Sequence, residues 1–225
     1  MQRVDENLWL LQYPLKVAGF DLQRHVGVIR LASGDVVLLS SGPFSPQDVT
    51  GIREVGRPRW LVEGMLRHDT FSREGHAAFP EAEFLAPPGF EDHVDFPVQP
   101  ILPPPDAWGS ELQALELEGI PASRETVFFH AESRTLFVQD LAFNFPGDHP
   151  LLRELLLRLA VGKHHAPGIA RSIKLQLRDR DAFEGALSRM LDWDFDRVVV
   201  GHGDRLETNG KAQLRAALAD AGFIA

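Results

Sequence analysis

Two polar side chains stand where apolar strands are predicted to end, and their types suit metal binding. His202 follows the apolar run 198–200 in "DRVVVGHGD" and lies between Gly201 and Gly203. Asp140 closes "RTLFVQD", a strand whose interior would not tolerate an unpaired carboxylate. Glycine neighbours let other backbone or a ligand approach closely, and α/β folds place their chemistry at strand ends. An imidazole and a carboxylate in these positions predict a metal site.

The elements that must position these residues can be read from the apolar pattern. Short apolar runs separated by Gly, Ser or Asp predict strands in the first third of the chain. A helix is predicted to begin at Pro46, with Ser45 as its N-cap and Asp48 three residues after the cap. The order is strands with few helices, then strands again, then helices with one late strand. This order predicts an α/β chain in which two sheets pack face to face with helices on their outer sides.

The clearest helix lies near the C-terminus. Asp181 and Glu184 are predicted to pair as a capping box at its start. Its apolar positions follow the helical repeat, at Phe183, Ala186, Leu187, Met190 and Leu191. We therefore expect this face to pack on a sheet.

A chain of 225 residues is expected to form a single domain, residues 1–225. The segment 87–105 holds seven of the sixteen prolines, so it can be neither a helix nor a central strand. We interpret it as an ordered crossing loop, with a domain linker as the competing interpretation.

Composition excludes several functions. There is no cysteine, which excludes disulfides, thiolate metal sites and a cysteine nucleophile, and which fits a reducing compartment. A formal charge of -9 argues against nucleic acid as a partner. No apolar stretch is long enough to span a bilayer, and the start of the chain has no signal-peptide core. We therefore expect a cytoplasmic protein without a nucleic-acid or membrane partner.

Two stretches resemble the metallo-β-lactamase fold superfamily. "ETVFFHAESRTLFVQDLAFNF" is similar to the strand pair of that superfamily that ends in a metal-bridging aspartate, and "FDRVVVGHGD" is similar to its final strand, which ends in the last histidine ligand. The resemblance covers most of the chain and suggests an uncharacterised branch. It implies a four-layer αββα sandwich, with two mixed β-sheets flanked by helices.

The chain departs from the superfamily at the main metal loop. Active members usually carry His-x-His-x-Asp-His after the strand that here reads "RWLVEG", whereas this chain has "MLRHDT". The alignment places Met65, Arg67, Asp69 and Thr70 at the four ligand positions, with His68 beside them. The resemblance therefore implies an eroded motif that cannot hold two metal ions.

A one-metal hydrolase is the first hypothesis for function. The resemblance carries over Asp140 and His202 as ligands, and His68 or Asp69 would complete the three that catalytic zinc needs. His130, at the end of the strand in "VFFHAE", is a further candidate ligand, although it could also be a solvated surface residue. The metal would be zinc, iron or manganese, and a metal-bound water would attack an ester, amide or phosphoester. No side chain is predicted to be the nucleophile.

The alternative hypothesis is a non-catalytic member of the fold that has lost its metal. Arg67 stands where an imidazole would face the metal, and its guanidinium could pair with Asp140 in place of the cation. The cleft would then bind a small molecule or a partner protein. The sequence specifies neither the substrate or ligand nor the oligomeric state.

Overall fold

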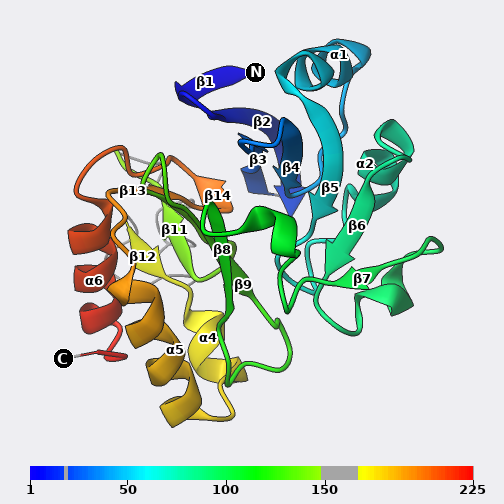
Figure 1. The fold of residues 1–225 in the computed structure, drawn as a ribbon. Helices are drawn as coiled ribbons and strands as arrows, with labels where there is room; N and C mark the ends of the chain where they lie inside the picture. The colour runs from blue at the N-terminus through cyan, green and yellow to red at the C-terminus, as the bar shows by residue number, and fades with distance from the viewer. Residues whose placement is uncertain (18–19, 148–166, 225) are drawn as a thin grey trace. The chain divides into compact units, whose positions relative to one another are not determined.

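The computed structural model describes residues 1–17, 20–147 and 167–224, and these divide into two compact units, residues 1–114 and 115–225 (Figure 1). That residues 1–225 form a single domain stays a prediction. Among the described residues, no helix is both long and apolar enough to cross a membrane.

The N-terminal unit is built on one mixed sheet in which the strands follow one another in chain order. The first four strands are antiparallel neighbours, and the remaining strands are added in parallel. The strands are β1 (Gln2–Asp5), β2 (Leu8–Val17), β3 (Phe20–Arg30), β4 (Asp35–Leu39), β5 (Arg57–Val62), β6 (Glu83–Ala86) and β7 (Gln99–Pro100). The helices are α1 (Pro46–Val55) and α2 (Ser72–Ala78), with the short 3-10 turns η1 (Phe90–His93) and η2 (Asp106–Trp108).

Helix α1 begins where the sequence predicted. The Ser45 hydroxyl accepts the N–H of Asp48, and the Asp48 carboxylate accepts the N–H of Ser45, so the predicted cap is confirmed. Ile52 on α1 is fully buried in an apolar cluster with Val36 and Leu38 of β4. The cap fixes where the helix starts, and this cluster holds the helix on the sheet.

The proline-rich segment 87–105 lies within the N-terminal unit. It holds η1 and the two-residue strand β7, which stands at the end of the strand order, next to β6 only. The described segment contains no α-helix and no central strand, as its prolines predict, although Phe90–His93 form the 3-10 turn η1. That it is a crossing loop stays a prediction.

The C-terminal unit has shorter strands in two mixed ladders, in the orders β13-β10-β9-β8 and β12-β11-β14. The strands are β8 (Leu112–Glu116), β9 (Thr126–His130), β10 (Thr135–Phe137), β11 (Ala142–Asn144), β12 (Gly168–Ile169), β13 (Arg197–Val199) and β14 (His202–Gly203). In the described part of this unit the helices are α4 (Arg171–Gln176) and α5 (Arg180–Asp192), between β12 and β13, and α6 (Gly210–Asp220), after β14.

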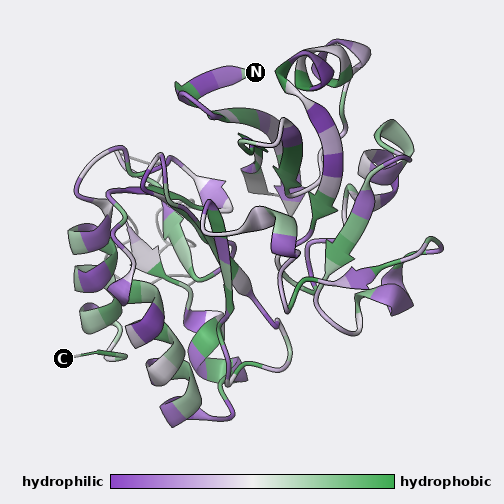
Figure 2. Cartoon of the chain, viewed as in Figure 1, coloured by the Kyte–Doolittle hydropathy of each residue, from purple (hydrophilic) through white to green (hydrophobic). Residues whose placement is uncertain are grey.

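Helix α5 buries the five apolar residues that the sequence singled out. They join an apolar cluster with Val127 of β9, Leu136 of β10 and Val198 of β13. Figure 2 shows that α5 and α6 carry both hydrophobic and hydrophilic bands. The predicted cap was wrong: the N-cap is Asp179, whose carboxylate accepts the N–H of Ala182, and α5 therefore starts one residue before Asp181.

Candidate metal site

Asp140 lies where two parallel ladders of the C-terminal unit fall out of step. In the first ladder Phe137 of β10 is opposite Val199 of β13, and in the second Phe143 of β11 is opposite His202 of β14. From the first pair to the second, the chain advances six residues on the β10–β11 side but only three on the β13–β14 side. The β10–β11 side therefore has three extra residues. Because the extra residues cannot all pair, the backbone around Asp140 bulges out of the sheet and presents its side chain.

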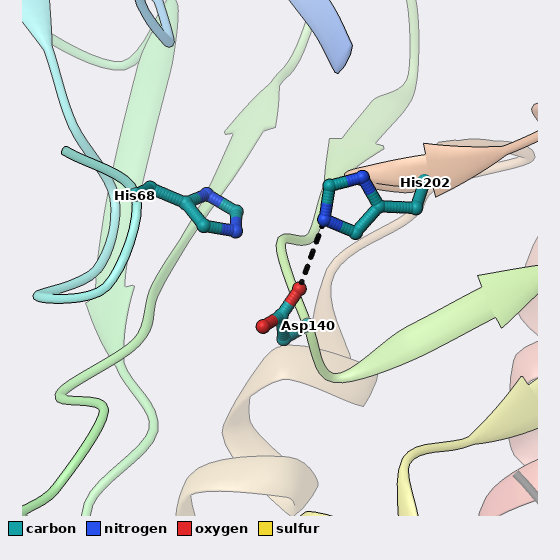
Figure 3. Close-up of side chains that lie close together, drawn as sticks. All are labelled: His68, Asp140 and His202. Carbon is teal, nitrogen blue, oxygen red and sulfur yellow. Dashed lines mark ion pairs between the residues drawn. The ribbon is translucent and has the colours of Figure 1, made fainter. Parts of the chain in front are cut away.

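His202 and Asp140 face each other across this irregularity. The His202 Nε2 lies 3.5 Å from the Asp140 Oδ1, as Figure 3 shows by a dashed line. The His202 side chain is 7% exposed and that of Asp140 is 35% exposed. The sequence therefore paired these two residues correctly, and it did so across about sixty residues of chain.

The separation of the two atoms suits ligands of one metal ion. Zinc binds His nitrogen and carboxylate oxygen at about 2.0–2.2 Å in tetrahedral geometry, so two of its ligand atoms lie about 3.4 Å apart. The observed Nε2–Oδ1 distance of 3.5 Å matches this edge. Asp140 and His202 thus fit two positions around a divalent cation with no movement of the backbone.

The two glycines beside His202 are explained by close backbone contacts. A Cβ on Gly201 would lie 2.8 Å from the carbonyl oxygen of Gln139, and a Cβ on Gly203 would lie 2.1 Å from that of Asn144. Gly203 also has a φ of +94°, which disfavours any other residue. The sequence predicted close approach of backbone or ligand here, and backbone is what the structure shows. His202 itself begins the two-residue strand β14, three residues after the end of β13.

An aromatic ring fixes the plane of the His202 imidazole. Phe143, its partner across the β11–β14 ladder, stacks on the imidazole with 5.7 Å between ring centroids and 14° between planes. Phe145 stacks in turn on Phe143. Because the imidazole is buried and stacked, its orientation is set before any ion binds.

Glu125 is a functional candidate that the sequence reasoning missed. It precedes β9 and is buried, and its Oε1 accepts the N–H of Gln139 at 2.7 Å. Burial, together with the negative charge of Asp140, raises the pKa of Glu125 to about 8. The available signal was an acidic residue directly before the apolar run "TVFF".

His68 lies in the N-terminal unit, on the loop between β5 and α2, and is buried. Its carbonyl oxygen accepts a hydrogen bond from Nη2 of Arg24, which also forms a 2.6 Å ion pair with Oε2 of Glu63. The Glu63 Oε1 accepts the N–H of Ser41. Burial raises the pKa of Glu63, and the Arg24 charge opposes that rise. This buried pair, which the sequence did not reveal, holds the backbone of the loop that carries His68.

Two other candidates on this loop are exposed. Arg67 and Asp69 both lie at the surface of the N-terminal unit, and Asp69 Oδ2 is 3.7 Å from Nδ1 of His93. The buried guanidinium near this loop is that of Arg24 on β3, and the carboxylate of Glu63 balances its charge. That Arg67 pairs with Asp140 stays a prediction.

His130 is not brought to the Asp140–His202 pair. It ends β9 and is opposite Thr135, the first residue of β10, whereas Asp140 comes after the other end of β10. Its Nδ1 lies 2.7 Å from the hydroxyl oxygen of Ser133, which in turn donates to Thr135. His130 is therefore part of a buried hydrogen-bonded turn and not a solvated surface residue.

No family model and no curated protein sequence matches the chain. Solved structures do. A metallo-β-lactamase from Pontibacter korlensis aligns with a TM-score of 0.63 over 97% of this chain and 98% of that one, at 12% identity. The metallo-β-lactamase FIM-1 from Pseudomonas aeruginosa, crystallised in a mono-zinc form, aligns with a TM-score of 0.64 over 100% and 96%, also at 12% identity. The chain has the metallo-β-lactamase fold.

The likeness extends to VMB-1, with a TM-score of 0.66 at 9% identity over 98% of this chain and 96% of that one. Full-length coverage confirms the predicted α/β class, with mixed sheets and flanking helices, and the resemblance first seen in two short stretches. At such low identity the metallo-β-lactamase fold is what is shared. The chemistry has to be argued from the residues of this chain.

Proposed function

We propose that this chain is a metal-dependent hydrolase with at most a one-metal site, to which Asp140 and His202 supply ligands. The observation that carries the proposal is the 3.5 Å separation of the Asp140 Oδ1 and the His202 Nε2, which fits two ligands of one ion. The third ligand expected from the sequence is His68 or Asp69, on the loop where active members of the fold carry their main metal motif. Three protein ligands are the number found in catalytic zinc sites.

The donor set limits the chemistry. Two imidazoles and one carboxylate suit zinc, iron or manganese. A divalent cation held there would polarise a carbonyl or phosphoryl oxygen and lower the pKa of water. The residues of the chain supply the rest: the fixed His202 ring orients the site, and the second Asp140 oxygen can accept a proton from attacking water. The substrate is an ester, an amide or a phosphoester.

Metal content per chain, measured by elemental analysis of tag-free protein after loading with zinc, iron or manganese, tests the proposal. We expect about one ion in the wild type and its loss in Asp140→Ala and His202→Ala. His68→Ala is expected to weaken binding strongly, whereas His93→Ala, which removes a half-exposed histidine from the same unit, is expected to leave binding unchanged.

Other outcomes are equally informative. Retention of the ion in His68→Ala would remove His68 from the ligand set, with Asp69→Ala as the next variant. Absence of any ion from loaded wild type would contradict the hydrolase and favour the alternative, a non-catalytic member of the fold that binds a small molecule or a partner. The loaded protein is screened against esters and phosphoesters only if the wild type binds about one ion.

A further inference from the structure

We infer that Glu125 is a positioning residue, which holds the Asp140 loop in the conformation that places the carboxylate beside His202. The inference rests on the proposed function, since it concerns a ligand of the proposed metal site. We therefore expect part of the metal affinity to depend on Glu125, although Glu125 is not itself a ligand.

The contacts of Glu125 converge on one short stretch of backbone. Its Oε1 accepts the backbone N–H of Gln139 at 2.7 Å, and the backbone N–H groups of Asp140 and Leu141 also act on this carboxyl group, in the direction that lowers its pKa. Successive N–H groups that point to one centre form an anion-binding concavity in many proteins. Here the group at the centre is a side chain of the chain itself, the carboxyl group of Glu125.

The ladder explains why this loop needs an external acceptor. Phe128 of β9 is opposite Phe137 of β10, so continuation of the register would bring Glu125 opposite Asp140. Strand β9 begins only at Thr126, and the chain around Asp140 leaves the sheet. Backbone N–H groups in this stretch therefore lose the partners that a regular strand would give them, and buried donors without partners are costly. The Glu125 side chain supplies the missing acceptors.

The opposite side of the loop is held by β13 and the residues after it. The N–H of Val138 donates to the carbonyl of Val199, and the N–H of Gly201 donates to the carbonyl of Gln139. Asp140 thus lies between a strand on one side and a buried carboxylate on the other. With its backbone held on both sides, the side chain of Asp140 needs little reordering to bind an ion, and this lowers the entropic cost of binding.

A graded series of variants tests the inference. Glu125→Leu removes both acceptors, and Glu125→Gln keeps one acceptor oxygen with nearly the same shape. The matched control is Glu116→Ala, which removes a carboxylate from neighbouring β8 that pairs with Arg124. Zinc affinity is measured by competition with a chelating dye. Loss of residues that orient metal ligands typically costs about 10–100-fold in affinity.

We expect Glu125→Leu to bind zinc about 10–100-fold more weakly, Glu125→Gln to fall between it and the wild type, and Glu116→Ala to bind as the wild type does. The absorption spectrum of the cobalt-loaded proteins gives a second readout, because it reports ligand geometry. Its bands should shift in Glu125→Leu and not in Glu116→Ala. Zinc affinity within twofold of the wild type in a folded Glu125→Leu would overturn the inference.

Amide hydrogen exchange of the metal-free protein separates this inference from the proposed function. In the wild type the N–H groups of Gln139, Asp140 and Leu141 should be protected, and Glu125→Gln, the milder variant, should expose them selectively. If the wild type binds zinc but the variants match it, the inference alone fails. If the wild type binds no metal, the proposed function fails, and the role of Glu125 toward a metal ligand fails with it.

Discussion

The buried ion pair between Arg24 and Glu63 should be the most sensitive point of the N-terminal unit. The Arg24 side chain is 4% exposed and that of Glu63 is 0% exposed. We consider Arg24→Met, which keeps the length of the apolar stem and removes the guanidinium. Glu63 would then be left as a buried carboxylate with the Ser41 N–H as a remaining donor.

The magnitude follows from burial. Removal of one partner from a buried pair costs about 3–5 kcal/mol, because the other charge stays buried without compensation. The lost hydrogen bond to the His68 carbonyl adds about 1 kcal/mol. The exposed pair Arg53–Glu81, with side chains 49% and 43% exposed, is the control, and Arg53→Met should cost no more than about 1 kcal/mol.

Urea unfolding of both variants measures the difference. We expect Arg24→Met to lose at least about 2 kcal/mol more than Arg53→Met. The double variant Arg24→Met with Glu63→Gln should recover most of the loss, because a neutral amide still accepts the Ser41 N–H. Equal losses in Arg24→Met and Arg53→Met would refute the reasoning.

The pH dependence of Arg24→Met gives an independent check. Burial already raises the pKa of Glu63, and the positive charge of Arg24 opposes this rise. Arg24→Met removes that opposing charge. A carboxyl whose folded-state pKa lies above its unfolded value destabilises the protein once pH exceeds the unfolded value, about 4.3. The penalty of Arg24→Met should therefore be smaller at pH 5 than at pH 8. A constant penalty would show that Glu63 is not the source.

Three further perturbations address the cap, the sheet and the proposed site. Ser45→Ala should cost about 1 kcal/mol in urea unfolding, because it removes the α1 cap; no loss would mean that the cap is redundant. Asp35→Asn should cost about 1–2 kcal/mol at pH 7, where two arginines of β5 bind the carboxylate. Burial raises the pKa of Asp35, but the arginines outweigh it and the pKa is lowered, so this stability is present above about pH 4 and is lost as pH falls through the folded-state pKa. The cost should therefore shrink toward pH 3, and a cost that persists there would contradict the assignment. Gly201→Ala should weaken zinc binding with the chain still folded, because its Cβ would push on the Gln139 carbonyl beside Asp140; unchanged affinity would show that the loop yields freely.

Local signals were read correctly from the sequence because their causes are local. The N-cap at Ser45 depends on a side chain and an amide three residues apart, and the apolar face of α5 depends on a repeat of 3.6 residues. The N-cap at Asp179 was missed by two positions, because Asp179 and Asp181 are both chemically able to cap and the backbone decides between them. The placement of Asp140 shortly after β10 and of His202 shortly after β13 followed from the same short-range patterns.

Tertiary structure alone decided what surrounds those residues. Nothing local shows that Glu125 would turn into the unit toward residues 139–141, or that Arg24 of β3 would pair with Glu63, the residue after β5. Only the long-range register brings these groups together, and only burial makes their charges matter. By itself the sequence determined which residue types could bind a metal and which apolar strands precede them. The fold decided how those residues are held, because buried backbone and buried charge must find partners wherever the chain brings them.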